Sequence, residues 1–155
     1  AAKVSRQGLY LHFANKEDLF RATVRHTIES ALAGAKRALA TENATLDERL
    51  RAAFDEWVGQ YVGRFAADAS DLMEAAEGLV GTLVTDQEKL FVDAVAATLR
   101  DAGLAAAYKP AGITPRQLAE TLCATARGLK HSCGTQEEFA RAFAIAVRII
   151  CSPLA

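Results

Sequence analysis

The stretch VSRQGLYLHFANKEDLF, residues 4–20, predicts more about the fold of this chain than any other part of it. Leu9 and Phe13 are four residues apart, so they share one face of a helix and can anchor it on its neighbours. Asn15 is a favourable N-cap, and Lys16 falls in the first turn of the helix that follows. The stretch therefore predicts a short helix over about residues 4–12 and a long helix that begins at Lys16.

The polar side chains of the short helix supply the hydrogen-bond donors that a DNA backbone and base edges require. They are Ser5, Arg6, Gln7, Tyr10 and His12. At the start of the next helix, the Lys16 ammonium and the exposed backbone N–H groups would both favour a phosphate. For an isolated segment, the alternative is a helical hairpin in which Tyr10 and His12 are half-buried.

Residues 4–20 resemble the recognition helix and the following helix start of the TetR family of bacterial transcriptional regulators, whose usual run is close to VSxGxLYxHFxxKExL. The resemblance implies a helix-turn-helix that reads operator DNA. By position, it assigns phosphate contacts to one set of residues and base-edge contacts to another. The phosphate set is Ser5, Tyr10, His12 and Lys16, and the base-edge set is Arg6 and Gln7.

Gly8 departs from the family pattern, because many members carry Thr or Ala there and have Gly one position earlier. Glycine removes a hydroxyl contact and weakens the helix by up to about 1 kcal/mol relative to alanine. It also lets the backbone approach DNA closely, so we include Gly8 among the expected DNA contacts and leave its base preference open. Since family members have two helices before the recognition helix, we expect roughly 30 further residues upstream of Ala1.

Charge is distributed unevenly along the chain. Residues 1–26 carry a net charge of +3, and the other 129 residues carry −4. A basic head on an acidic body suits a DNA-binding protein with a separate regulatory domain. We therefore expect two domains: the remainder of a helix-turn-helix domain over residues 1–26, and a ligand-binding and dimerisation domain over residues 27–155.

Composition excludes several other classes of protein. Apolar residues make up 51% of the chain and charged residues 24%, and no uncharged apolar run reaches the ~20 residues of a membrane helix. The three cysteines have no CxxC spacing, so we expect no disulfide framework and no metal, and we expect a cytoplasmic protein. We see no Ser/His/Asp arrangement and no GxxxxGK loop, and we expect neither a cofactor nor enzyme activity.

The remaining pattern predicts an all-α fold. Besides residues 16–40, we expect a helix that opens at the capping box Thr45–Glu48 and keeps its apolar ladder to Phe65. We expect four further helices. The first is a less regular segment over residues 68–84. The others run from a second capping box at residues 85–88 to near Gly103, from Thr114 to about Ser132, and from a third capping box at residues 135–138 to before Pro153. Residues 104–113 read as a loop.

Aromatic and apolar side chains of the middle helices suggest a ligand pocket, as the family resemblance implies. The candidate lining residues are Phe54, Trp57, Tyr61, Phe65, Met73, Leu83, Phe91 and Cys123. The alternative is that these side chains fill the core and leave no space. Gly59 and Gly63 are expected on one face of the same helix, where they allow either a close helix crossing or room for a ligand.

The last two helices have more apolar surface than one core needs, which suggests a second subunit. In the TetR family the equivalent helices form a four-helix dimer interface, and the candidate residues here are Leu122, Ala126, Leu129, Phe139, Phe143 and Ile150. The alternative is a thick monomer core. A two-fold dimer would place two recognition helices about 34–36 Å apart and would read a palindromic site in double-stranded DNA.

These features together suggest a homodimeric repressor that a small hydrophobic or amphipathic effector releases from its operator. The alternative is a helical dimer that binds a small molecule or a protein without reading DNA.

Overall fold

The computed structural model describes residues 13–63 and 81–152 of the chain. The short helix predicted over residues 4–12 and most of the irregular segment predicted over residues 68–84 lie outside these ranges. All the secondary structure of the described residues is helical, as the sequence predicts.

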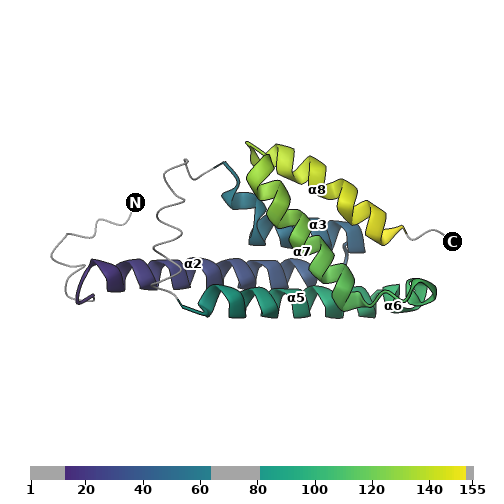
Figure 1. Ribbon diagram of the computed structural model, residues 1–155, viewed down its shortest axis with the longest axis horizontal. Coiled ribbons are helices and arrows are strands. Elements are labelled where there is room, and N and C mark those ends of the chain that lie inside the picture. Colours follow the sequence, from purple (N-terminus) through teal and green to yellow (C-terminus); the bar gives the residue numbers. More distant parts are fainter. Residues whose placement is uncertain (1–12, 64–80, 153–155) are drawn as a thin grey trace.

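Five long helices form the body: α2 (Lys16–Leu39), α3 (Leu46–Trp57), α5 (Leu83–Asp101), α7 (Pro115–Ser132) and α8 (Gln136–Cys151). Each of them packs on two others in a closed ring, in the order α2, α3, α8, α7, α5 and back to α2. In Figure 1, α2 and α5 run side by side in the same direction, and α7 crosses the body on its way to α8. The core lies inside this ring.

Four of the five long helices begin where the sequence predicts. Asn15, Thr45, Thr114 and Thr135 are their N-caps, and each side chain accepts a hydrogen bond from a backbone N–H three residues later. At Thr45 and Thr114 the capping box is complete, because the side chain of the third helical residue also binds the cap backbone. At Thr135 the box is incomplete, since Glu138 accepts from the N–H of Gly134 instead.

The predicted capping box at residues 85–88 is wrong. Helix α5 begins at Leu83, and its N-cap, Thr82, makes no side-chain capping bond. Thr85 therefore lies inside the helix, and Glu88 forms an ion pair with Arg127 of α7. The S/T-x-x-E pattern is local, whereas the partner of this glutamate is 39 residues away.

The helix predicted from Thr45 to Phe65 is also wrong in its second half. Helix α3 ends at Trp57, and a short 3₁₀ helix follows, η1 (Gly59–Tyr61). Gly59 and Gly63 consequently do not share a helix. Gly63 has a φ of +72°, and its backbone lies directly against the carbonyl oxygen of Gly134, where a Cβ would clash. This close approach joins the end of η1 to the turn between α7 and α8.

Residues 104–113 are not the loop that the sequence suggests. Gly103, at a φ of +84°, turns the chain into a short helix, α6 (Leu104–Ala107), and a 3₁₀ turn, η2 (Lys109–Ala111). Leu104 is buried and Tyr108 is half-buried against the core, so this connection is packed on the body. A spacing of four residues places both side chains on the same face of the short helix.

Candidate functional site

The N-terminus of α2 is the described part of the predicted DNA-binding surface. The Asn15 side chain accepts a hydrogen bond from the backbone N–H of Asp18 at 2.8 Å and so holds the first turn in place. Lys16 is the first residue of the helix and its side chain is exposed. Its ammonium is therefore accessible beside a helix N-terminus, the combination that favours a phosphate.

The other predicted DNA contacts lie outside the described residues. They are Ser5, Arg6, Gln7, Gly8, Tyr10 and His12.

Helix α2 connects this surface to the core without a break. The domain boundary predicted after residue 26 falls within the helix. No residue from Lys16 to Ser30 is buried, whereas Leu32, Ala35 and Leu39 are buried in the core. A displacement of the second half of α2 would therefore be carried to Lys16 along the helix axis.

An aromatic cluster occupies the centre of the ring of helices. Phe54 contacts Phe91 edge to face, with ring centroids 4.9 Å apart, and lies 4.5 Å from Phe143. Phe143 in turn stacks on Phe139 at 5.6 Å. All four side chains are at most 1% exposed, so these rings fill the core.

The predicted pocket residues are therefore in two environments. Phe54, Phe91 and Cys123 are buried, while Trp57, Tyr61 and Leu83 are half-buried. Phe65 and Met73 lie outside the described residues. Trp57 stacks on Phe91 at 5.0 Å and, being half-buried, lies at the edge of the aromatic cluster.

The predicted dimer residues mostly lie in the core of their own subunit. Leu122, Ala126, Phe139 and Phe143 are at most 1% exposed, Ile150 is 7% exposed, and Leu129 is half-buried. Side chains this deep have almost no surface left for a second subunit. The exposed apolar residues of α8 are instead Ile145, at 60%, and Ile149, at 67%. The sequence indicated these two residues only through the width of the apolar surface of α8, which extends around the helix beyond the row that faces the core.

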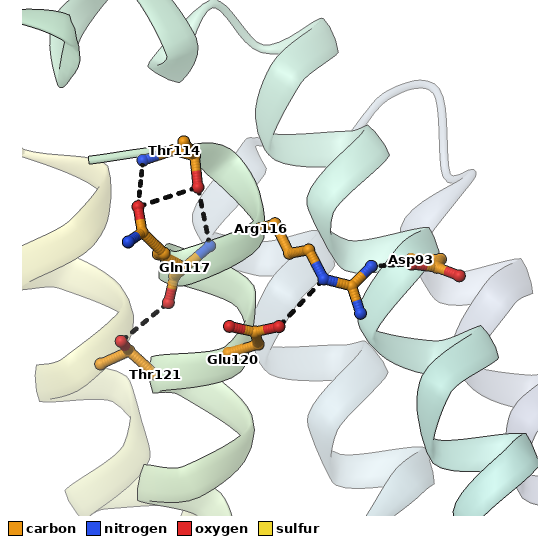
Figure 2. Close-up of polar contacts among 6 residues, drawn as sticks. All are labelled: Asp93, Thr114, Arg116, Gln117, Glu120 and Thr121. Carbon is orange, nitrogen blue, oxygen red and sulfur yellow. Dashed lines mark hydrogen bonds and ion pairs between the residues drawn. The ribbon is translucent and has the colours of Figure 1, made fainter. Parts of the chain in front are cut away.

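One face of α7 carries small residues and threonines. The hydroxyl groups of Thr121 and Thr125 donate to the carbonyl oxygens of Gln117 and Thr121 within the helix, both at 2.8 Å; Figure 2 shows the first of these bonds. Each of these hydroxyl hydrogens is therefore used inside the helix. A Cβ placed on Gly128 would have no atom within 4 Å, so there is open space beside this helix.

Ion pairs connect a different face of α7 to α5. Arg116 bridges Asp93 of α5 at 2.6 Å and Glu120 of its own helix at 2.9 Å, as Figure 2 shows. These hydrogen bonds, the one to Asp93 first, raise the pKa of the arginine above its ordinary value. The Arg127–Glu88 pair connects the same two helices further along. The pairs are exposed and stabilise weakly, but they show which side of α7 faces α5.

The three cysteines are unpaired thiols. Burial, and to a lesser degree the Glu88 carboxylate, raises the pKa of the Cys123 thiol to about 12, and burial raises that of Cys151 to about 11. Both thiols are therefore protonated near neutral pH, where a thiol reacts slowly.

The described residues contain neither a group of metal-binding side chains nor a membrane-spanning helix. In residues 13–63 and 81–152, no three His, Cys, Asp or Glu residues are grouped so that they could hold a metal ion. Over the same ranges, no helix is both long and apolar enough to cross a membrane.

Comparison with known proteins identifies the N-terminal segment. Residues 1–23 match the protein-family model described as "Bacterial regulatory proteins, tetR family". This segment is similar to the DNA-binding segment of TetR-family regulators. The matched segment ends at Thr23, inside α2, so it contains the predicted recognition helix, Lys16 and the first third of the connecting helix. Searches of curated proteins and of solved structures give no significant match.

The match supports a DNA-binding regulator of the TetR type and agrees with the all-α fold. It also counts against the alternative of a helical module that does not read DNA. The match does not extend to residues 24–155.

Proposed function

We propose that this protein is a TetR-type homodimeric repressor that a small apolar or amphipathic effector releases from a palindromic operator. The observation that carries the proposal is the continuity of α2, which begins in the family-matched DNA-binding segment and ends in the core of the body. The proposed domains are residues 1–26 and 27–155, with α2 passing through both. Such a helix can couple two binding sites.

The effector site is proposed at the edge of the aromatic cluster. Trp57 is half-buried and stacks on Phe91, and Phe91 belongs to α5, which packs along α2. A ligand that contacts the Trp57 indole would therefore act on a helix that lies against the connecting helix. Aromatic walls favour an apolar or amphipathic ligand.

The second subunit is proposed to cover the exposed faces of α7 and α8. Successive residues of an α-helix are about 100° apart, so Ile149 lies on the opposite side of α8 from Ala140, which borders the groove toward α3. On α7, Gly128 and Thr121 lie about 100° or more from Arg127, whose side chain faces α5. The exposed face of α8 is thus turned away from α3 and that of α7 away from α5, and the two lie on neighbouring helices, which suits a two-fold contact between copies.

Trp57 is the only tryptophan in the chain, so its fluorescence is a direct probe of effector binding. The experiment first selects an operator from random duplex DNA with the intact protein. It then titrates a panel of hydrophobic compounds while following both Trp57 fluorescence and release of labelled operator. A compound that changes the fluorescence and weakens DNA binding at least tenfold, about 1.4 kcal/mol of coupling, is the expected result. Compounds that bind at Trp57 and leave DNA affinity unchanged would contradict the repressor mechanism.

Lys16 provides a test of the DNA-binding surface. Lys16→Gln should weaken binding to all duplex sequences by about tenfold and reduce the salt dependence by roughly one phosphate contact per subunit. The matched control is Lys36→Gln, an exposed lysine near the other end of the same helix, which should leave affinity unchanged. Equal effects of the two substitutions would refute a phosphate contact at Lys16.

A further inference from the structure

The C-terminal end of α8 is joined to a segment that is distant in sequence. The Tyr108 hydroxyl donates to the carbonyl oxygen of Ile150 at 3.0 Å, and it also lies 3.4 Å from the carbonyl oxygen of Ile149. Tyr108 belongs to the connection between α5 and α7, 42 residues before Ile150. This contact is therefore not part of the local structure of α8.

The carbonyl groups in the last turn of a helix have no intrahelical donors. The regular donor for Ile149 would be the N–H of residue 153, which is a proline and has none. The N–H of Ser152 already binds the carbonyl oxygen of Arg148 at 3.0 Å. The Tyr108 hydroxyl thus supplies a donor to this last turn, at the carbonyl oxygen of Ile150 and beside the Ile149 carbonyl that has no regular donor.

The packed connection holds Tyr108 in place for this contact. Its backbone N–H donates to Leu104 at 3.0 Å, and its carbonyl oxygen accepts from Ile113 at 3.3 Å. Leu104 is buried at 7% exposure, and the Tyr108 ring packs against the core. The packing of this connection on the core therefore fixes the position of the hydroxyl group.

The turn that Tyr108 holds carries Ile149, the more exposed of the two isoleucines on the outer face of α8. Ile145 lies one turn earlier on the same face, so the two side chains form one apolar row only while the last turn stays helical. We infer that Tyr108 is a positioning residue of the subunit interface: its hydroxyl keeps the last turn of α8 ordered and so keeps Ile149 aligned with Ile145 for a second copy of the chain. This inference rests on the homodimer proposed above.

The test is the dissociation constant of the dimer, measured by sedimentation over a dilution series of the intact protein. Tyr108→Phe retains the ring and removes only the hydroxyl group. The last turn of the separate subunit then frays, and association must reorder it in both copies. The dissociation constant should rise about five- to twentyfold, and the amides of residues 149–152 should exchange faster with solvent.

The matched control is Thr135→Ala, which removes the N-cap at the opposite end of the same helix. It should lower the thermal stability of the subunit while changing the dissociation constant by less than about twofold. Equal weakening of the dimer by both substitutions, or no weakening by Tyr108→Phe, would overturn the positioning role. A wild-type protein that stays monomeric at all concentrations would instead overturn the homodimer, and the amide exchange of Tyr108→Phe would then report separately on whether the hydroxyl orders the turn.

Discussion

The two halves of α2 have the same secondary structure but different environments. From Ala31 to Leu39 the helix buries one face in the core, next to α3 and α5, whereas from Lys16 to Ser30 no residue is buried. In the first half the described stabilising contacts are local, such as the Asn15 cap and the Thr23 and Thr27 hydroxyls, which donate to carbonyl oxygens four residues earlier. Backbone bonds of this type often accompany helix bending.

This difference suggests that the two halves of α2 have different roles. The body half is held by buried non-local packing, whereas the described hydrogen bonds of the head half lie within its own turns. A helix whose buried residues lie toward one end can change direction at the other end at little cost to the core, as an effector-controlled DNA-binding head requires. Three comparisons test this view, in order of decreasing expected effect.

The largest effect should come from leucine residues in the two halves. Leu39→Ala removes a side chain that is 4% exposed and should lower the free energy of unfolding by about 2–5 kcal/mol. Leu19→Ala makes the same chemical change at a half-buried position and should lower it by less than about 1.5 kcal/mol. Urea unfolding of the two variants measures the difference, and equal losses would show that the head half is as well anchored as the body half.

A smaller effect is expected at the corner where α3 turns back onto the body half of α2. The Arg49 side chain donates to the carbonyl oxygen of Leu39, and Thr45 caps α3 four residues earlier. Thr45→Ala should therefore cost about 1 kcal/mol in thermal or urea unfolding.

Thr85→Ala is the control for the cap, because the same sequence pattern surrounds Thr85 although it lies inside α5. Its expected change is near zero or slightly stabilising, since alanine is the better helix former. A loss at residue 85 as large as that at residue 45 would show that the pattern acts as a cap at both positions.

The smallest effect is a pH dependence at the same corner. The hydrogen bond from the Thr45 backbone, followed by that from its side chain, lowers the pKa of Glu48 below its ordinary value. Because the folded pKa is depressed, the stabilisation is complete above the ordinary value and is lost as the pH falls through the folded one.

Glu48→Gln keeps an acceptor for the Thr45 N–H and removes the charge. The variant should have a lower urea midpoint than the wild type at pH 7, and the two midpoints should converge as the pH falls below about 4. A constant gap between the two across this range would mean that the Glu48 charge contributes nothing to the corner.

The sequence by itself determined where most helices begin. Asn15, Thr45, Thr114 and Thr135 are caps because a short polar side chain binds a backbone N–H only three residues away, and such chemistry is local. The DNA-binding segment could be predicted for a related reason, since its residues are consecutive and match one family pattern.

Tertiary structure decided what depends on distant partners. Three contacts join residues that are 39 or more positions apart. They are the close approach of Gly63 to Gly134, the ion pair between Glu88 and Arg127, and the hydrogen bond from the Tyr108 hydroxyl to the Ile150 carbonyl oxygen of α8. The faces of α7 and α8 were also decided there. Both rows of apolar residues on α8 have helical spacing, and only the packing of the ring of helices buries Phe139 and Phe143 while leaving Ile145 and Ile149 exposed. Periodicity identifies an apolar row, but the neighbours of the helix determine which row faces the core.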